Sequence, residues 1–402
     1  MFERTLFHAS RIGRHVRRYG PRYLIRAPLN ELRNPRLGFT RWVRSGLVSA
    51  VDLFRASPRE AGRCPDECLV FAFDLGCAPV TFDFATFLAG AELERRRRGL
   101  ARIFVVFIPG SYDGLRRELP EYESAIAPSL RHWRKRHIVI SMLTLLPTVQ
   151  GYAMCPDRET AGAMLPEDRS VLFPADYRVW LPRQPEKRVV QDHVAAGVSI
   201  WPMFRSTDRA RQLVAEFLAS VCRDRRAVVI TLRASAAAPR RNSRVDEWAE
   251  FARGLDRRRF TPIFVDDSEA PIDGCKSASL AGETFCDSAR WNVEIRMALY
   301  EAAWLNLAVM HGPMELCWYS EASRYVLFLE VGTEPGSSEE AITEGGARIG
   351  ADLQFATPFQ HVVWGRDDAA TIATAFDAMA HRIELAAEHT EPPRRTPQPP
   401  TH

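Results

Sequence analysis

No run of about eighteen apolar residues occurs in this chain of 402 residues, which excludes a conventional transmembrane helix. Lysine is scarce, since only Lys135, Lys187 and Lys276 are present, and arginine therefore carries almost all of the positive charge. The opening segment MFERTLFHASRIGRHVRRYG lacks the continuous apolar core and the small-residue cleavage site of a secretory signal. We therefore expect a cytoplasmic protein.

The chain also lacks a dense cysteine framework, because its eight cysteines are spread over the whole length. Small disulfide-stapled domains concentrate their cysteines in a short segment, so we expect reduced thiols. Cys64 and Cys68 lie close together, but no second Cys or His pair follows at the spacing of a zinc site. The sequence therefore predicts no metal and no bound cofactor.

Positive charge gathers in residues 1–45, which hold eleven arginines against two glutamates, with apolar residues interleaved. We interpret 1–59 as a basic amphipathic arm. It could lie on an anionic membrane surface, where each basic group contributes about 1 kcal/mol, or it could be a solvated tail. No recognition motif for nucleic acid accompanies the charge, so we do not expect nucleic-acid binding.

The segment 60–183 has the alternating pattern of an α/β domain. An apolar run at 68–74 predicts a buried strand, 81–100 has helical spacing, and 101–110 is typical of a strand again. Three further apolar segments are expected as strands: 137–149, 171–174 and 177–182. This order favours a parallel sheet covered by helices.

A second domain is expected over 206–388, after a proline-rich crossing at 184–205. Ser206 or Thr207 is expected to cap its first helix. The expected strands are 227–233, 261–267, 305–310 and 324–330, and the expected helices are 206–224, 243–256, 291–304, 315–322 and 367–389. This order predicts a doubly wound parallel sheet, whose carboxyl edge is the usual ligand site. The proline-rich segment 389–402 is expected to be a disordered tail.

The first segment that could carry chemistry follows the strand that ends at Arg233. A loop of small residues leads to Arg240, Arg241, Asn242 and Ser243 at the start of a helix. Guanidinium groups bind phosphate in bidentate fashion, and the free amides of a helix N-terminus favour negative charge. We interpret the loop as an anion site. The alternative is that Asn242 or Ser243 only caps the helix and the arginines are solvated.

The second segment is the turn after strand 305–310, which consists of His311, Gly312, Pro313, Met314 and Glu315. Its amides are candidates to hold a diphosphate, and Glu315, or more remotely Glu321, is a candidate to accept hydrogen bonds from ribose or sugar hydroxyls. The alternative is a plain strand-to-helix turn with proline at its first position.

Other polar residues of the second domain have weaker assignments. Asn292 is a candidate to contact the nucleobase. Asp266 and Asp267 close strand 261–267 but form no Asp-x-Asp pair of the metal-dependent sugar transferases. We expect Glu294 and Glu301 to form surface pairs with Arg296 and its neighbours.

Together, the two segments resemble the carboxyl-terminal domain of two-domain glycosyltransferases of the GT-B type, over about residues 226–330. The turn is similar to the Gly-Pro-Met or Gly-Pro-Thr turn of heptosyltransferase-like families, where it faces the donor phosphates. Arg233 with its Arg-Asn-Ser loop is similar to a pattern in uncharacterised capsule- and lipopolysaccharide-type glycosyltransferases, and distantly to the donor-binding arginine of fucosyltransferase-like folds. His311 and Glu315 depart from the turn, because an acidic or polar residue and a histidine usually stand there.

The resemblance implies the GT-B fold, in which two Rossmann-like doubly wound domains face each other across a cleft. It implies a nucleotide-diphosphate sugar on the second domain, a glycan or glycolipid acceptor at the first, and a base from the first domain. Asp74, at the end of its strand, is the first candidate for this base, and Asp83 is the second. Alternatively, Asp74 hydrogen-bonds its own turn and Asp83 complements a helix N-terminus.

We therefore expect a metal-independent glycosyltransferase that acts at the inner face of the membrane. Two other functions suit the same pattern. One is a nucleotide-sugar epimerase, which acts on the donor without an acceptor. The other is a non-catalytic GT-B scaffold that binds a glycan or a partner.

Overall fold

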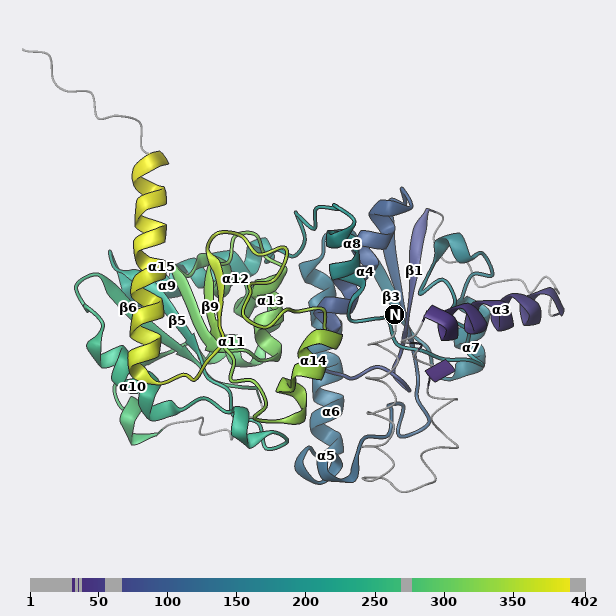
Figure 1. Ribbon diagram of the computed structural model, residues 1–402, viewed down its shortest axis with the longest axis horizontal. Helices are drawn as coiled ribbons and strands as arrows, with labels where there is room; N and C mark the ends of the chain where they lie inside the picture. The colour runs from purple at the N-terminus through teal and green to yellow at the C-terminus, as the bar shows by residue number, and fades with distance from the viewer. Residues whose placement is uncertain (1–30, 33–34, 36–37, 55–66, 269–276, 391–402) are drawn as a thin grey trace, which may run out of the picture. The chain divides into compact units, whose positions relative to one another are not determined.

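The computed structural model describes residues 31–32, 35, 38–54, 67–268 and 277–390 (Figure 1). Most of the basic arm and the end of the expected tail lie outside these ranges. By their contacts the residues form two units, of which the first comprises the chain up to residue 79, 90–118 and 148–189. The second unit comprises 80–89, 119–147 and 190–402. No helix in the described ranges is both long enough and apolar enough to cross a bilayer.

The first unit contains a four-stranded parallel sheet in the order β3-β2-β1-β4. Its strands are β1 (Cys68–Asp74), β2 (Arg102–Ile108), β3 (Val149–Met154) and β4 (Leu172–Phe173). Every residue of β1 is buried, as the unbroken apolar run predicts. Helix α4 (Phe84–Arg97) connects β1 to β2, which confirms the β-α-β pattern expected from the sequence.

Two of the strands expected in the first domain are wrong. Residues 137–149 are largely helical, because α6 (Pro128–Arg134) continues into a π-helix (Lys135–Ile140) and a 3-10 helix (Ser141–Leu145). Ile138, Met142 and Leu145 are buried at helical spacing, and a short apolar run alone does not distinguish this pattern from a strand. Residues 177–182 form a turn closed by an antiparallel bridge between Arg178 and Leu181.

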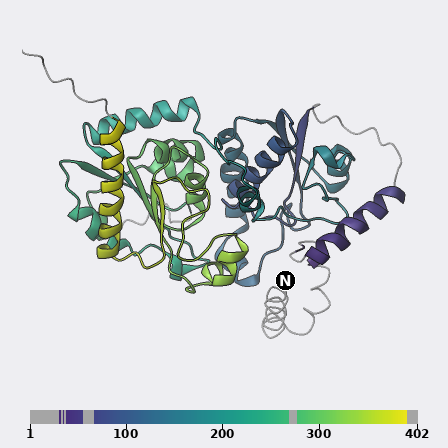
Figure 2. The same ribbon diagram turned by 45° about the horizontal axis from the view of Figure 1, so that its top comes forward.

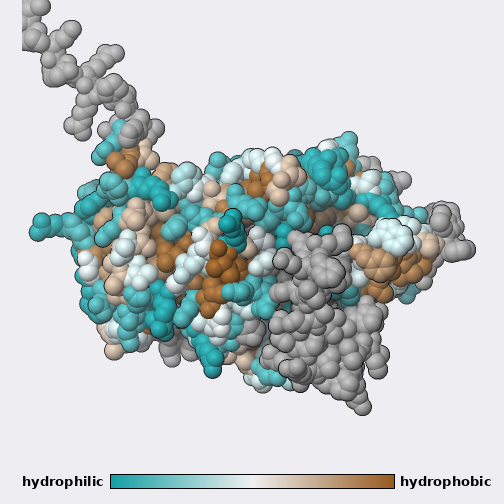
Figure 3. Space-filling view, in the orientation of Figure 1, coloured by the Kyte–Doolittle hydropathy of each residue, from teal (hydrophilic) through white to brown (hydrophobic). Residues whose placement is uncertain are grey.

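Helix α3 (Gly38–Phe54) also belongs to the first unit, and its hydrophobic side chains are visible on the surface in Figure 3. The remaining helices of the unit are α7 (Arg158–Met164) and the short segment Arg169–Val171.

The second unit contains a six-stranded parallel sheet in the order β10-β9-β8-β5-β6-β7. Its strands are β5 (Arg226–Thr231), β6 (Phe260–Val265), β7 (Thr284–Phe285), β8 (Leu305–Val309), β9 (Tyr325–Phe328) and β10 (Gln360–Val363). Numbered from β5, this is the strand order 3-2-1-4-5-6 of dinucleotide-binding folds. The doubly wound sheet is therefore confirmed, and β7 and β10 add two short strands that the sequence pattern did not indicate.

Helices cover both faces of the second sheet (Figures 1 and 2). Val228 and Ile230 of β5 join Trp248 of α10 (Val245–Gly254) and Phe376 of α15 (Ala369–Thr390) in one core. On the opposite face, the hydroxyl groups of Thr231 and of Tyr300 in α12 (Val293–Ala302) are 3.1 Å apart. Helix α9 (Asp208–Cys222) packs beside α12 and begins after Thr207, whose side chain accepts a hydrogen bond from Ala210 N and so confirms the expected cap. Further helices in the described part of the unit are α5 (Pro120–Ala125), α6, α8 (Val189–Ala195), α11 (Asp287–Trp291), α13 (Glu315–Trp318) and α14 (Glu339–Glu344).

Candidate functional site

The strand order places the reversal point of the second sheet between β5 and β8. Loops that leave the carboxyl ends of two such strands run in opposite directions, and the crevice between them is where this fold binds ligands. The loop that begins at Arg233 and the turn that begins at His311 are these two loops. A pocket of about 40 Å³ lies at this edge, lined by Arg240 and Arg241 of the first loop, by Met310 just before the turn, and by Glu330 after β9.

Three polar side chains hold the loop after β5 in shape. The Arg233 guanidinium donates to the carbonyl of Ala238, at 2.8 Å, and to Asn242 Oδ1. Asn242 Oδ1 also accepts from the amide of Ser235 at 2.9 Å, and Ser243 Oγ accepts from the amide of Arg233 at 2.8 Å. Arg233, Asn242 and Ser243 therefore fix the backbone from which the neighbouring arginines project.

The interpretation of Asn242 or Ser243 as a helix cap is wrong, because α10 begins after Arg244 without a side-chain cap from either residue. The carboxylate at the start of α10 is instead that of Asp367. Its Oδ2 accepts from the amide of Arg244 at 3.0 Å and from Trp248 Nε1 at 2.8 Å. Burial raises the pKa of the Asp367 carboxyl. The amide end of α10 already holds this carboxyl group, which leaves the arginine side chains as the groups available to an anion.

Arg241 is the cation at the centre of this crevice. Its Nη2 donates to the carbonyl of Met310 at 3.0 Å, and its Nε is buried without a hydrogen-bond partner. Burial, together with the nearby charge of Arg233, lowers the pKa of Arg241 to about 10, and the carboxylates of Glu334 and Asp83 oppose this shift. The guanidinium thus stays charged at neutral pH, yet it forms no ion pair with any described residue. A bound anion would balance this positive charge.

His311 lies beside Arg233 at the end of β8 and is 6% exposed. Burial lowers its pKa to about 4, so the ring is neutral at pH 7. Its Nδ1 lies 2.7 Å from the carbonyl of Val309, which accepts only from a protonated nitrogen and so fixes the tautomer. Nε2 is then an acceptor, and it is buried without a protein partner. A ligand hydroxyl is the kind of donor that would satisfy it.

The lowered pKa of His311 makes stability depend on pH. The unfolded histidine, with an ordinary value of 6.5, binds its proton more readily than the folded one. Its contribution to stability is therefore complete above about pH 6.5 and is lost as the pH falls toward 4. Between pH 7 and pH 5 the wild type should lose about 2 kcal/mol of unfolding free energy that a His311→Gln variant does not lose. Urea unfolding at both pH values measures the difference, with exposed His381→Gln as the control that should follow the wild type.

The turn after β8 is closely packed. Gly312 begins a 3-10 turn (Gly312–Met314), and a Cβ atom on it would lie 3.1 Å from Cβ of Phe82. Pro313 and Met314 are buried. Helix α13 follows with only four residues, so the helix expected over 315–322 is too long, and no extended helix N-terminus stands at this turn.

Glu315 is also buried, and its Oε2 accepts a hydrogen bond of 2.8 Å from the Thr86 hydroxyl. The Thr86 hydroxyl lies 3.0 Å from that of Tyr319. This network gives Glu315 a partner inside the protein, and we do not assign it to a ligand.

The two candidate bases have different surroundings. Asp74 is fully buried at the end of β1, where Oδ1 accepts from the amide of Gly76 and from Arg158, and Oδ2 accepts from Arg158 and the Tyr177 hydroxyl. These four bonds use all the lone-pair positions of the carboxylate. They support the alternative in which Asp74 holds its own turn, and they disfavour a role as a base.

Asp83 is only half-buried and precedes α4 in a segment that belongs to the second unit. Its charge raises the pKa of Arg241, and also that of the buried Tyr319. Asp83 is therefore the one of the two carboxylates whose charge acts on Arg241.

The remaining sequence assignments fall on α12 and β6. Asn292 caps α12, since its Oδ1 accepts from the amides of Glu294 and Ile295 at 2.9 and 3.1 Å, and its contact with a nucleobase stays a prediction. Asp266 and Asp267 are buried at the end of β6. In the described part of the chain, no group of three or more His, Cys, Asp and Glu side chains is arranged to hold a metal ion.

The expected surface pairs on α12 are wrong. Arg296 is 1% exposed and donates to the carbonyls of Ala289 and Asp266. Glu294 accepts from the Thr207 hydroxyl at 2.8 Å, and Glu301 binds Ser206. These carboxylates therefore hold the residues that lead into α9. They form no surface pairs because α12 is buried on more sides than an amphipathic surface helix.

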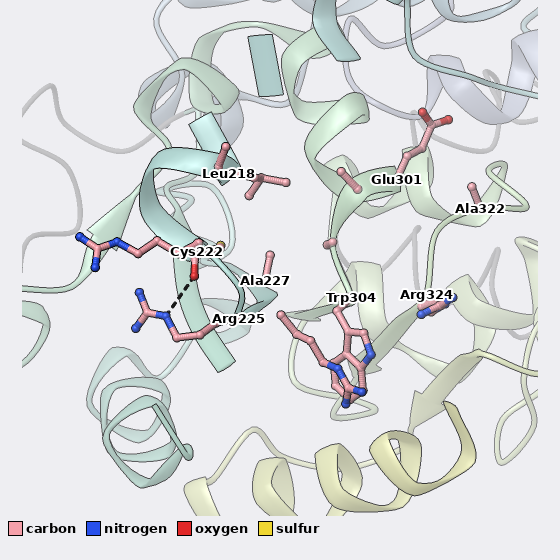
Figure 4. A pocket seen from close by; sticks show the side chains of 13 residues that line it. Leu218, Cys222, Arg225, Ala227, Glu301, Trp304, Ala322 and Arg324 are labelled. Carbon is pink, nitrogen blue, oxygen red and sulfur yellow. Dashed lines mark hydrogen bonds between the residues drawn. The ribbon is translucent and has the colours of Figure 1, made fainter. Parts of the chain in front are cut away.

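A larger pocket, of about 400 Å³, lies at the opposite edge of the second sheet, near the first residues of β5 and β8 (Figure 4). Two of its arginines have clear partners in the protein. Arg225 donates to the carbonyls of Val221 and Cys222, and Arg226 pairs with Glu384 and stacks on Trp304. This edge is not the ligand edge of the fold, and we assign no function to the pocket.

No protein-family model matches the chain, and no curated protein matches it. Among solved structures, the chain is similar to ADP-heptose lps heptosyltransferase II of E. coli, at 11% identity over 79% of this chain and 99% of that one, with a TM-score of 0.45. It is similar to a glycosyl transferase family 9 protein of Veillonella parvula, at 12% identity over 79% and 91%, with a TM-score of 0.40. The E. coli heptosyltransferase WaaC with ADP gives 11% identity over 79% and 98%, with a TM-score of 0.37. Likeness at this level does not transfer an activity, so function must follow from the side chains of the crevice.

Proposed function

We propose that the protein is a metal-independent glycosyltransferase of the GT-B type, which moves a sugar from a nucleotide-diphosphate sugar to a glycan or glycolipid acceptor. The observation that supports this most directly is the half-buried guanidinium of Arg241 at the reversal point of the second sheet, charged and without an ion pair among the described residues. A diphosphate supplies the missing negative charge in the geometry that guanidinium binds best.

In this proposal, Arg241 and Arg240 bind the donor diphosphate, and the loop fixed by Arg233, Asn242 and Ser243 keeps them in position. The positive charge stabilises the departing nucleoside diphosphate, so the reaction needs no essential metal. The neutral His311 ring accepts a hydrogen bond from a donor hydroxyl through Nε2, which is otherwise unsatisfied.

Asp83 is the proposed base. Its charge acts on Arg241, and the residue is partly exposed. Removal of the hydroxyl proton as the oxygen attacks the sugar carbon is general-base catalysis. The acceptor and the inner membrane face stay parts of the proposal, together with contact between residues 1–45 and anionic lipid.

An Arg241→Ala variant tests the donor site. Loss of a charge-assisted contact should weaken nucleoside-diphosphate binding by roughly tenfold to a hundredfold. Isothermal titration calorimetry with ADP, GDP, UDP and CDP measures the affinities. Arg253→Ala, which changes an arginine on the last turn of α10, is the matched control and should bind as the wild type does.

Unchanged affinity of Arg241→Ala for every nucleoside diphosphate, or no binding by the wild type, would contradict the proposal. Conversion of the donor without an acceptor would instead assign a nucleotide-sugar epimerase. Donor or glycan binding without any turnover would assign a non-catalytic scaffold.

A further inference from the structure

Helix α3 buries Arg44 and Val48 but leaves large apolar side chains exposed, which is unusual for a surface helix. Phe39 and Trp42 are 70% and 73% exposed, and Leu47 is 39% exposed. At 100° per residue these positions lie on one arc, which also contains Val43, Gly46 and Ala50. Large exposed apolar groups gathered in this way mark an interaction surface.

Two charged residues of α3, Arg44 and Asp52, fasten the helix to the first unit. Arg44 is fully buried, and its guanidinium donates to Asp176 Oδ2 at 2.6 Å and to the carbonyls of Leu32 and Leu181, each at 2.7 Å. Both partners of Asp52 are arginines, Arg169 at 2.8 Å and Arg178 at 2.6 Å. The orientation of the helix is therefore fixed by ion pairs, and its apolar arc is held outward.

The charge of the adjoining sequence indicates what covers this arc. Residues 1–37, which lead directly into α3, contain nine arginines and two glutamates. A second copy of the chain would add another nine arginines to the complex, and like charges repel each other. An anionic lipid surface attracts the arginines and accepts the apolar side chains, and tryptophan is enriched at that interface.

We propose that α3 lies in the plane of an anionic membrane, with Phe39, Trp42 and Leu47 inserted among the lipids. Basic groups and a short apolar helix face supply the two contributions that stable peripheral binding requires. This inference deepens the membrane contact in the proposed function and does not depend on the donor site. Vesicle binding and nucleotide binding are measured separately, so failure of one is distinguishable from failure of the other.

Flotation of the full chain with vesicles of phosphatidylcholine and phosphatidylglycerol tests the inference. The wild type should float with mixed vesicles and much less with phosphatidylcholine alone. The double variant Phe39→Ser with Trp42→Ser should bind the mixed vesicles roughly a hundredfold more weakly, at about tenfold for each ring. The control is Leu119→Ser with Leu213→Ser, which removes two side chains that are 50% and 45% exposed elsewhere, and it should float as the wild type does.

Quenching by brominated lipids provides an independent measurement, since wild-type fluorescence should be quenched on binding and a Trp42→Phe variant should lose most of this quenching. Equal flotation of the wild type and the double variant would overturn the inference. So would wild-type protein that does not float with the mixed vesicles. A wild-type dimer that the double variant dissociates would overturn it too, by assigning the face to self-association.

Discussion

An Asp74→Ala variant is expected to lose about 2 to 3 kcal/mol of unfolding free energy, because it removes a fully buried carboxylate whose partner Arg158 is 33% exposed. The carboxylate is fully buried, and it binds Arg158 through two hydrogen bonds and Tyr177 through one. Without it, the tyrosine hydroxyl loses its partner and the guanidinium loses its counter-charge, although Arg158 still donates to the carbonyls of Pro109 and Val179. Burial, with the charge of Asp74 adding to it, raises the pKa of Tyr177, so the phenol stays neutral and does not replace the missing charge.

Urea unfolding, with hydrogen exchange of peptides from β1 and β2, measures this loss in the first unit. Asp52→Ala is the matched control, since Asp52 also binds two arginines but its side chain is 34% exposed, and its cost should stay below about 1 kcal/mol. If Asp74→Ala does not fold, Asp74→Asn keeps the shape of the side chain and should show a smaller loss. A change below 1 kcal/mol in Asp74→Ala would remove the structural role and restore Asp74 as a candidate base.

The elements that the sequence predicted well are those with long, unambiguous patterns. Every residue of β1 is buried, as is every residue of β5 after Arg226, and α9 has both a cap and helical spacing. Residues 137–149 failed because a buried helix and a buried strand share the same composition over a short run. The strands β7 and β10 have only two and four residues, too few to produce a period.

The position of the site was predictable because the carboxyl ends of parallel strands meet at one edge. The roles of its residues were not, since they depend on partners far away in the sequence. Asp367 occupies the start of α10, and Glu334 faces Arg240 and Arg241 from the segment after β9. Only one feature of the sequence could have pointed to Glu334 as a site residue: it follows β9, the strand next to β8. Nothing in the local pattern distinguished Asp83 from Asp74 as the carboxylate beside Arg241.

An Asp83→Asn variant should transfer sugar roughly a hundredfold to ten-thousandfold more slowly than the wild type, the usual range for loss of a general base. Asparagine has nearly the shape of aspartate but accepts no proton. The same change removes a negative charge near Arg241, and that charge opposes the binding of an anionic donor. Donor affinity should therefore stay equal or become tighter while turnover falls, which a general loss of folding would not produce.

Release of nucleoside diphosphate measures turnover, with calorimetry of donor binding on the same samples. Asp287→Asn, at the exposed start of α11, changes the charge of the second unit by the same amount and should leave both quantities unchanged. Wild-type turnover in Asp83→Asn would exclude Asp83 as the base. A donor that binds more weakly, with turnover reduced only in proportion, would instead make Asp83 part of the binding surface. Only a fall in kcat at undiminished donor affinity assigns the proton transfer to this carboxylate.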